Sequence, residues 1–276
     1  VRVALVQLCS GDDPDANLAA TEALVREAAA GGAELVATPE CTNMMSASRA
    51  RQAALLRPEA EDPTLARLSA VAAELGLRLL IGSLLVKTGD PDGRFANRSF
   101  LIGPDGAIAA RYDKIHMFDV DLDGGESYRE SAAFRPGDRA VTAQAGAATL
   151  GLSICYDLRF PRLYRALAQA GADVIAVPAA FTVPTGRAHW QTLLRARAIE
   201  TGAYVIAPAQ SGEHQAAEGA PRRTWGHSLA VAPWGEVLAD AGEPTGVTLV
   251  DLDLAEAARA RARVPSLRHD RSFAGP

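Results

Sequence analysis

The sequence predicts an α/β fold in which helices cover mixed β-sheets. Short apolar runs alternate with Ala-rich helical segments, several runs are joined by tight-turn sequences, and 48% of the 276 residues are hydrophobic. No Ser- or Pro-rich linker, internal repeat or low-complexity tract interrupts this pattern. We therefore expect residues 1–276 to form a single domain, near the upper size limit for one core.

Apolar runs and helix-ending glycines define the elements expected in the N-terminal half. The helix at 17–30 has apolar residues near helical spacing and ends at Gly31-Gly32, and the helix at 63–75 ends in the same way at Gly76. The predicted elements in chain order are strand 2–8, helix 17–30, strand 33–40, helix 63–75, strand 77–86, a hairpin turn at 89–93, and two strands within 97–114 joined by a turn at 103–106.

The C-terminal half continues the alternation of strands and helices. Segment 212–228 is the exception, because it is rich in Ala and Gly and is expected to be a flexible loop. Helical crossovers together with hairpins indicate mixed sheets whose faces are covered by helices. The predicted elements are strand 147–154, helix 162–170, strand 173–178, helix 187–200, strand 204–208, a hairpin within 227–240 with its turn at 233–235, and strand 247–252.

The composition argues against two classes of partner. The formal net charge is −5 and no block of Lys or Arg is present to neutralise phosphates, so a nucleic-acid surface is not expected. No apolar run reaches the roughly 20 residues that span a bilayer. The start VRVALVQLCS is interpreted as a strand and not as a signal peptide. No membrane association is therefore expected.

The cysteines and histidines lack the spacing of disulfide frameworks and metal sites. Cys9, Cys41 and Cys155 are odd in number, so a disulfide framework is not expected and a reducing cytoplasm is the default location. The histidines have no close, repeated spacing of the kind that zinc sites show, so no metal is expected. They are His116, His189, His214, His227 and His269.

Reactive side chains stand at the ends of predicted strands. Glu40 and Lys114 each end a predicted strand, and Cys155 directly follows the strand at 147–154. Catalytic groups gather at such positions because the sheet fixes the backbone while the adjoining loop leaves the side chain accessible. A thiol that attacks a carbonyl, a carboxylate that moves its proton and an ammonium that faces the oxyanion would together perform acyl transfer.

Each of these residues also has an ordinary structural interpretation when it is taken alone. Most buried cysteines are small hydrophobic groups, and Cys9 and Cys41 keep that interpretation. A single glutamate after a strand is commonly a cap or solvated, and a single lysine is commonly a surface charge. Structural roles are likewise expected for His116, His189, Trp190 and His227. Only the joint placement of Glu40, Lys114 and Cys155 favours catalysis.

The segment around Cys155, beginning GLSICYDLRFP and running to RARAIE, resembles the nucleophile region of the nitrilase superfamily, the carbon-nitrogen hydrolases. The resemblance is to its Nit branch, which contains deaminated glutathione amidases and omega-amidases. It extends in order over nearly the whole chain, through VALVQL, TPE, RYDKIHMFDVD and WGHSLAVAPWGEVLAD. It implies a four-layer α-β-β-α sandwich whose subunits pair into a homodimer or higher homo-oligomer, with the helix after the nucleophile in the interface.

The resemblance also implies a role for each site residue at a matching position. Cys155 is the nucleophile, Glu40 the general base and Lys114 the oxyanion-stabilising cation. A second glutamate that positions the lysine and the substrate matches Glu130 in YRESAAF, with nearby Glu126 as the alternative. The backbone N–H of Tyr156 is expected in the oxyanion hole, and Phe181 and Thr182 of PAAFTVPTG are expected to bind the substrate. No metal or organic cofactor is implied.

The implied substrate is a small amide. PAAFTVPTG, and RARAIE followed by APAQSGEH, resemble deaminated glutathione amidases more than omega-amidases, the alternative. Both activities would leave a 2-oxoglutarate-type acyl group on the cysteine, so discrimination is expected on the leaving-group side. Segment 212–228 is a local departure from the family pattern, and in the family such loops border the active site. The acyl carboxylate calls for a cationic side chain of the protein. Arg195 and Arg197 lie two residues apart on a predicted helix and therefore point in different directions, so at least one of them is expected to form a structural ion pair. The candidates are Arg159, Arg187, Arg195 and Arg197.

Three other readings are less well supported. A nitrilase proper or an N-carbamoyl amidase disagrees with the Nit-like FTVPTGRAHW. A non-catalytic scaffold of the same fold disagrees with the joint presence of Glu40, Lys114 and Cys155. A redox-thiol protein would need a second cysteine placed to resolve a sulfenic acid, and neither Cys9 nor Cys41 is so placed.

Overall fold

Two six-stranded β-sheets form the centre of the computed structural model, which describes residues 1–121, 127–218 and 221–275. The first sheet has the order β16-β1-β2-β3-β4-β5. Its central strands β1, β2 and β3 are parallel, and the outer strands pair antiparallel. The strands are β1 (Arg2–Gln7), β2 (Leu35–Ala37), β3 (Arg78–Lys87), β4 (Phe95–Ile102), β5 (Ile108–Asp113) and β16 (Gly246–Asp251).

The second sheet repeats this pattern with the order β15-β14-β11-β10-β9-β8. Strands β9, β10 and β11 are parallel at its centre, and β8, β14 and β15 pair antiparallel outside them. The strands are β8 (Val141–Ala145), β9 (Ala148–Leu152), β10 (Val174–Ala176), β11 (Tyr204–Ala207), β14 (Leu229–Val231) and β15 (Val237–Asp240).

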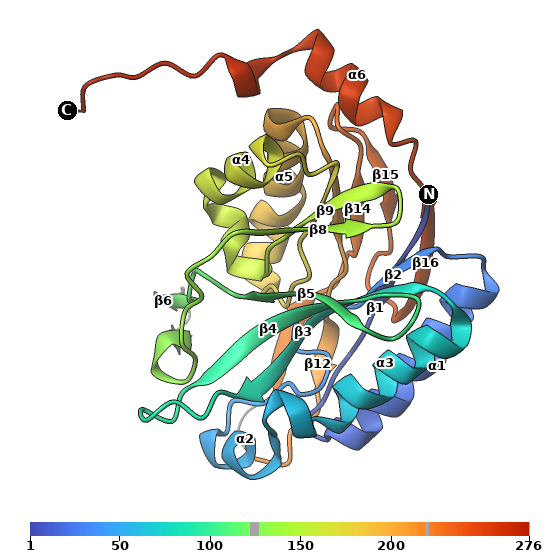
Figure 1. Cartoon of the computed structure of the whole chain (residues 1–276). Helices are drawn as coiled ribbons and strands as arrows, with labels where there is room; N and C mark the ends of the chain where they lie inside the picture. Colours follow the sequence, from blue (N-terminus) through green and yellow to red (C-terminus); the bar gives the residue numbers. More distant parts are fainter. Residues whose placement is uncertain (122–126, 219–220, 276) are drawn as a thin grey trace.

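The sheets pack against each other and helices cover their outer faces, as Figure 1 shows. Alternation along β1 explains the layering, because successive side chains of a strand point to opposite faces. Val3 and Leu5 lie in the core shared with the second sheet, whereas Ala4 and Val6 pack in the core beneath the outer helices. Helices α1 (Pro14–Ala30) and α3 (Pro63–Leu75) cover the first sheet, and α4 (Pro161–Gln169) and α5 (Val183–Thr201) cover the second. The expected four-layer α-β-β-α sandwich is confirmed.

The expectation of a flexible loop at 212–228 is wrong for residues 212–214 and 222–225, which lie in strands. Strands β12 (Ser211–His214) and β13 (Arg222–Trp225) form an antiparallel pair there. The pair is anchored to the body of the protein, because the N–H of Trp225 donates to the carbonyl of Phe181 at 3.0 Å. The Trp225 ring also packs so closely on α5 that a Cβ at Gly186 would lie 2.2 Å from it. This packing outweighs the low strand propensity of the local sequence.

Other differences from the expected elements are smaller. Helix α5 begins at Val183, four residues before the expected start at 187, because Pro184 fits the first turn, where no N–H partner is needed. Several short elements have weak periodicity and were not predicted: α2 (Arg49–Leu55), α6 (Ala255–Arg263), β6 (Asp119–Asp121), β7 (Ser127–Arg129) and β8, with the 3₁₀ turns Glu59–Glu61, Glu130–Ala132, Cys155–Arg159 and Ser266–Arg268.

A glycine allows the strand ends of the two sheets to approach each other. Gly82 lies in β3 at a register irregularity between Ile81 and Leu84. A Cβ built on Gly82 would lie 2.0 Å from the carbonyl oxygen of Thr38, just after β2, and 2.5 Å from Pro178, just after β10. Because any larger residue would force these segments apart, Gly82 brings the end of β2 against the second sheet.

Candidate active site

A cavity of about 310 Å³ lies where strand ends of the two sheets meet, a volume within the range of small-molecule sites. Its lining comes from segments that follow β2, β5, β9 and β10 and from the strand β13. It includes seven of the residues that the sequence suggested for catalysis or substrate binding: Glu40, Lys114, Glu130, Cys155, Tyr156, Phe181 and Thr182.

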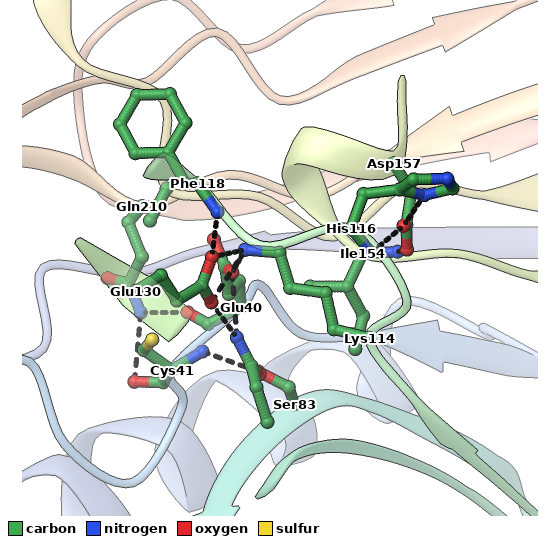
Figure 2. A network of polar contacts seen from close by, with 12 residues as sticks. Glu40, Cys41, Ser83, Lys114, His116, Phe118, Glu130, Ile154, Asp157 and Gln210 are labelled. Atoms are coloured by element: carbon green, nitrogen blue, oxygen red, sulfur yellow. Dashed lines mark hydrogen bonds and ion pairs between the residues drawn. The ribbon is translucent and has the colours of Figure 1, made fainter. Parts of the chain in front are cut away.

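Glu40 and Lys114 form a buried ion pair at the floor of this site. Glu40 lies in the turn after β2, and Lys114 follows β5, so the first sheet positions both. The Nζ of Lys114 lies 2.9 Å from Oε1 of Glu40, and the lysine is only 2% exposed. The same Oε1 accepts a hydrogen bond from Nδ2 of Asn97 at 2.9 Å, and Gln210 donates to the backbone carbonyl of Glu40 (Figure 2).

Glu130 is the second carboxylate on the lysine. It begins a 3₁₀ turn, and both of its oxygens lie 2.9 Å from Nζ of Lys114. The backbone N–H of Phe118 donates to its Oε2 at 2.6 Å, which fixes the carboxylate in this position, as seen in Figure 2. The alternative residue for this role, Glu126, lies outside the described residues.

The ion pairs shift the pKa values of Glu40 and Lys114. Burial alone would raise the pKa of Glu40, but the charge and hydrogen bond of Lys114 outweigh it, so the pKa is lowered. Burial would lower the pKa of Lys114, but Glu130 and Glu40 raise it well above its ordinary value. Glu40 is therefore ionised and Lys114 charged at neutral pH.

Cys155 opens a 3₁₀ turn three residues after the end of β9. Its backbone N–H donates to the carbonyl of Pro178 at 2.9 Å, so the second sheet holds the residue in place. Its φ of 49° is in the left-handed region, which costs energy for a residue with a side chain. Cys41, beside Glu40, also has a positive φ of 59° and lines the cavity. Strained backbone thus occurs on two sides of this cavity.

The Cys155 thiol is protonated at rest. Burial and the charge of Glu40 raise its pKa well above the ordinary value, although Lys114 and the N–H of Ala180 oppose this. Hydrogen bonding to Cys155 is in turn one of the causes that lower the pKa of Glu40. The arrangement therefore places an ionised carboxylate against a neutral thiol, which is the starting state for general-base activation of a nucleophile.

Tyr156, Phe181 and Thr182 line the same cavity as Cys155. Tyr156 is the second residue of the 3₁₀ turn, where backbone N–H groups have no partner within the helix, and no described group accepts from its N–H. The Thr182 hydroxyl lies 2.8 Å from that of Thr185, and Phe181 packs on Trp190. These residues form part of the cavity wall together with Cys155.

The arginines suggested for the substrate carboxylate do not line the cavity. Arg195 donates to the carbonyl of Gly235, and Arg197 donates to Leu158 and pairs with Glu200, so both make structural contacts. Arg187 is exposed beside the Trp225 ring. Arg159 lies outside the lining, with its Cζ 5.9 Å from the centre of the Tyr156 ring and 5.6 Å from that of the Phe181 ring.

The expectation about Cys9 needs correction, and His214 had been given no role. Cys9 is exposed, because it lies beyond the end of β1, whereas Cys41 is buried as expected. His214 lines the cavity, with Nδ1 2.8 Å from the carbonyl oxygen of Ser10 and Nε2 2.7 Å from the Thr224 hydroxyl. Burial lowers the pKa of His214 to about 4, so the ring is neutral and pins β12 and β13 to the first sheet.

Asn97 and Arg222, which were not predicted from the sequence, also line the cavity. Asn97 had only a weak signal, since it is a buried polar residue of strand β4, which also contains Arg98 and Ser99. Arg222 had none, because it lies in the segment that was interpreted as a loop.

The described part of the chain contains neither a candidate metal site nor a membrane-spanning helix. Within 1–121, 127–218 and 221–275, no group of three or more His, Cys, Asp or Glu side chains is placed to hold a metal ion. None of the helices in these ranges has the length and apolar character needed to cross a bilayer.

A four-layer sandwich with a thiol, a carboxylate and an ammonium in one cavity defines a hydrolase of the acyl-transfer class. The chain belongs to the carbon-nitrogen hydrolase family, also called the nitrilase superfamily, whose model matches residues 2–262. It is accordingly a hydrolase of carbon–nitrogen bonds other than peptide bonds.

Three similar proteins illustrate the relationship. A deaminated glutathione amidase of Yersinia enterocolitica is 39% identical over 274 residues, which cover 98% of this chain and 92% of that protein. The omega-amidase NIT2 of Homo sapiens is 36% identical over 271 residues, 98% and 95% of the two chains. The crystal structure of Saccharomyces cerevisiae Nit3, a member of branch 10 of the nitrilase superfamily, superposes with a TM-score of 0.84 at 29% identity, covering 98% and 96% of the two chains.

Proposed function

We propose that this protein is an amidase that hydrolyses deaminated glutathione through a thioester on Cys155. The observation that carries the proposal is the joint burial of Glu40, Lys114 and Cys155 around one cavity. The name of the Yersinia enterocolitica relative supports the choice of substrate.

Acylation begins with the ionised Glu40 taking the proton of the Cys155 thiol while the sulfur attacks the amide carbonyl carbon. The new C–S bond places negative charge on the carbonyl oxygen, which the Lys114 ammonium and the N–H of Tyr156 stabilise. The C–N bond then breaks, and Glu40 returns the proton to the leaving nitrogen. Glu130 holds Lys114 in place, since both of its oxygens contact Nζ.

Deacylation uses the same groups in reverse order. Glu40 removes a proton from a water molecule that attacks the thioester carbonyl, and Lys114 again faces the oxyanion. The C–S bond breaks, the sulfur recovers a proton from Glu40 and the carboxylic acid leaves. Every proton is carried by a residue of this chain, so the proposed reaction requires no metal or organic cofactor.

The second candidate is an omega-amidase activity on 2-oxoglutaramate, which the 36% identity to human NIT2 favours. Both substrates deliver a 2-oxoglutarate-type acyl group and differ in the leaving group. A site that also holds the peptide leaving group can apply that binding energy to the transition state. We expect a higher kcat/KM for deaminated glutathione when both are measured with one preparation. A ratio favouring 2-oxoglutaramate by about tenfold, about 1.4 kcal/mol, would select the omega-amidase.

We also propose that residues 1–276 act as one catalytic domain in a cytoplasmic homodimer or larger homo-oligomer. Both sheets supply site residues, which supports one domain. The thiols of all three cysteines are free, which suits a reducing compartment. The exposed apolar side chains Ile199, Trp234 and Leu238 lie on α5 and around the β14–β15 turn and support a subunit contact. Light scattering after gel filtration tests it, and a monomeric mass would contradict it.

A further inference from the structure

Arg222 presents a guanidinium to the cavity from strand β13. One of its terminal nitrogens donates to the carbonyl of Ala180 at 2.7 Å, and the other contacts the sulfur of Met45 at 3.7 Å. Its Cζ lies 5.4 Å from the centre of the Tyr128 ring. Since Ala180, Met45 and Tyr128 line the cavity as well, these contacts hold the guanidinium at the wall of the reaction space.

The charge of Arg222 is compensated less fully than the other cation of the site. Lys114 has two carboxylates within 2.9 Å, whereas no Asp or Glu among residues 1–121, 127–218 and 221–275 forms an ion pair with Arg222. The Nε of Arg222 is buried and has no hydrogen-bond partner in these ranges. A buried donor of this kind is normally paired, so an acceptor from a ligand would complete the arrangement.

The other arginine of the cavity wall is already neutralised. Arg129 lines the cavity, but its guanidinium contacts both carboxylate oxygens of Asp121, at 2.8 and 2.9 Å. Arg222 is therefore the cation of the described lining that keeps donors available. A guanidinium is planar, always charged and matches the geometry of a carboxylate.

We infer that Arg222 binds a carboxylate of the substrate and thereby sets the preference of the enzyme for acidic amides. The inference rests on the proposed function, because deaminated glutathione carries one carboxylate at the end of its acyl chain and one on its leaving group. The chemistry is the same for both carboxylates, and 2-oxoglutaramate, which has only the acyl one, separates them.

The test compares kcat/KM for deaminated glutathione, 2-oxoglutaramate and the uncharged pentanamide in the wild type and in Arg222→Met. The readout is the ratio of each acidic amide to pentanamide, which removes any general loss of catalysis. We expect Arg222→Met to lower the ratio for deaminated glutathione at least tenfold, mainly through KM. If the ratio for 2-oxoglutaramate falls equally, Arg222 binds the acyl carboxylate. If only deaminated glutathione is affected, Arg222 binds the leaving group.

The neighbouring Arg223 provides the matched control. It is exposed on the same strand, and adjacent side chains of a strand point to opposite faces, so Arg223→Met should leave both ratios within twofold. Arg222→Lys keeps the charge without the planar fork and should give an intermediate ratio, which protects the test if Arg222→Met folds poorly. Unchanged ratios in both Arg222 variants would overturn the inference while the proposed function stands. A wild type without preference for the acidic amides would overturn both.

Discussion

Glu40 and Glu130 share the ammonium of Lys114 at the cavity, whereas the fully buried Asp157 is satisfied without a lysine or arginine among the described residues. Asp157 accepts a hydrogen bond from the hydroxyl of Tyr112 at 2.6 Å. It does not line the cavity, although it follows the nucleophile by only two residues. Figure 2 draws both networks.

The Asp157 network ties together the segments that carry the reactive groups. Asp157 accepts from the backbone N–H of Ile154 at 2.9 Å, directly before Cys155, and from that of His116 at 3.0 Å, two residues after Lys114. The His116 ring lies 2.6 Å from the same carboxylate and stacks on Phe160.

The difference between the Glu40–Lys114 network and the Asp157 network shows how a buried carboxylate can be interpreted. One that faces a cavity and is balanced by a cation has a charge that is available to the reaction. One that is sealed in the core and surrounded by other donors fixes geometry. The account therefore assigns chemistry to Glu40 and positioning to Asp157, and the following predictions test that division.

The largest effect is expected at the nucleophile. Cys155→Ala should lower kcat/KM by roughly four orders of magnitude or more, because no other thiol can form the thioester. Cys155→Ser should be nearly as inactive, since a hydroxyl is much harder to deprotonate. Amide hydrolysis assays measure both, with Cys9→Ala, an exposed thiol, as the control that keeps full activity. A Cys155→Ala variant with activity comparable to that of the wild type would contradict the thioester mechanism.

The next largest effect is expected at the cation. Lys114→Met should lower kcat by about 10²–10³, because its charge matters most when the oxyanion forms. Lys114→Arg should restore little, since the planar guanidinium cannot occupy the same point. Thermal melts of both variants identify any loss of folding from the two carboxylates left unpaired. A change in KM alone would make Lys114 a substrate anchor.

A smaller effect on rate, with a clear effect on stability, is expected at Asp157. Asp157→Asn keeps one acceptor oxygen but places an NH₂ group, itself a donor, against the groups that donate to Asp157. This should lower the free energy of unfolding by about 1–3 kcal/mol. Urea denaturation measures this loss. The drop in kcat at 25 °C should stay well below that of Lys114→Met. An Asp157→Asn variant with wild-type stability and no activity would show that Asp157 takes part directly in the reaction.

The smallest expected effect concerns the pH profile of kcat/KM, which should depend on the network of Glu40 and Lys114 and not on that of Asp157. Because the pKa of Glu40 is lowered, the base is lost only as the pH falls through that lowered value, below the ordinary carboxyl range. Because the pKa values of Cys155 and Lys114 are raised, their protons leave only above their ordinary ranges. The profile of kcat/KM should therefore be flat from about pH 5 to 8. Asp157→Asn should leave both limbs in place, and a limb near pH 6–7 would indicate a different base.

Much of the fold was predictable because its signals are local. The helix at 63–75 has the predicted bounds, since Gly76 ends it with a φ of 64°. Strands β1 and β3 follow from apolar runs that are buried along most of their length, and β16 follows from the apolar run within 247–252, which is only partly buried. The geometry of Glu40, Lys114 and Cys155 followed from strand ends combined with the family resemblance.

The parts that could not be predicted depend on contacts between distant segments. Strands β12 and β13 exist because Trp225 packs on α5, which the Ala- and Gly-rich local sequence does not reveal. Arg222 lines the cavity because of that packing. The arginines predicted from the sequence to bind the substrate carboxylate instead make structural contacts or lie outside the lining. The burial of Lys114 likewise needs its two carboxylates, which come from turns far away in the chain.

The most direct test of the account is to trap the acyl-enzyme. Wild-type protein is mixed with excess deaminated glutathione, quenched in acid within the first turnovers and digested for peptide mass spectrometry. The account predicts a 2-oxoglutaryl mass increment on the peptide that contains Cys155, and its absence from the peptides of Cys9 and Cys41. An adduct on Cys9 or Cys41, or burst release of cysteinylglycine without any adduct on Cys155, would contradict it.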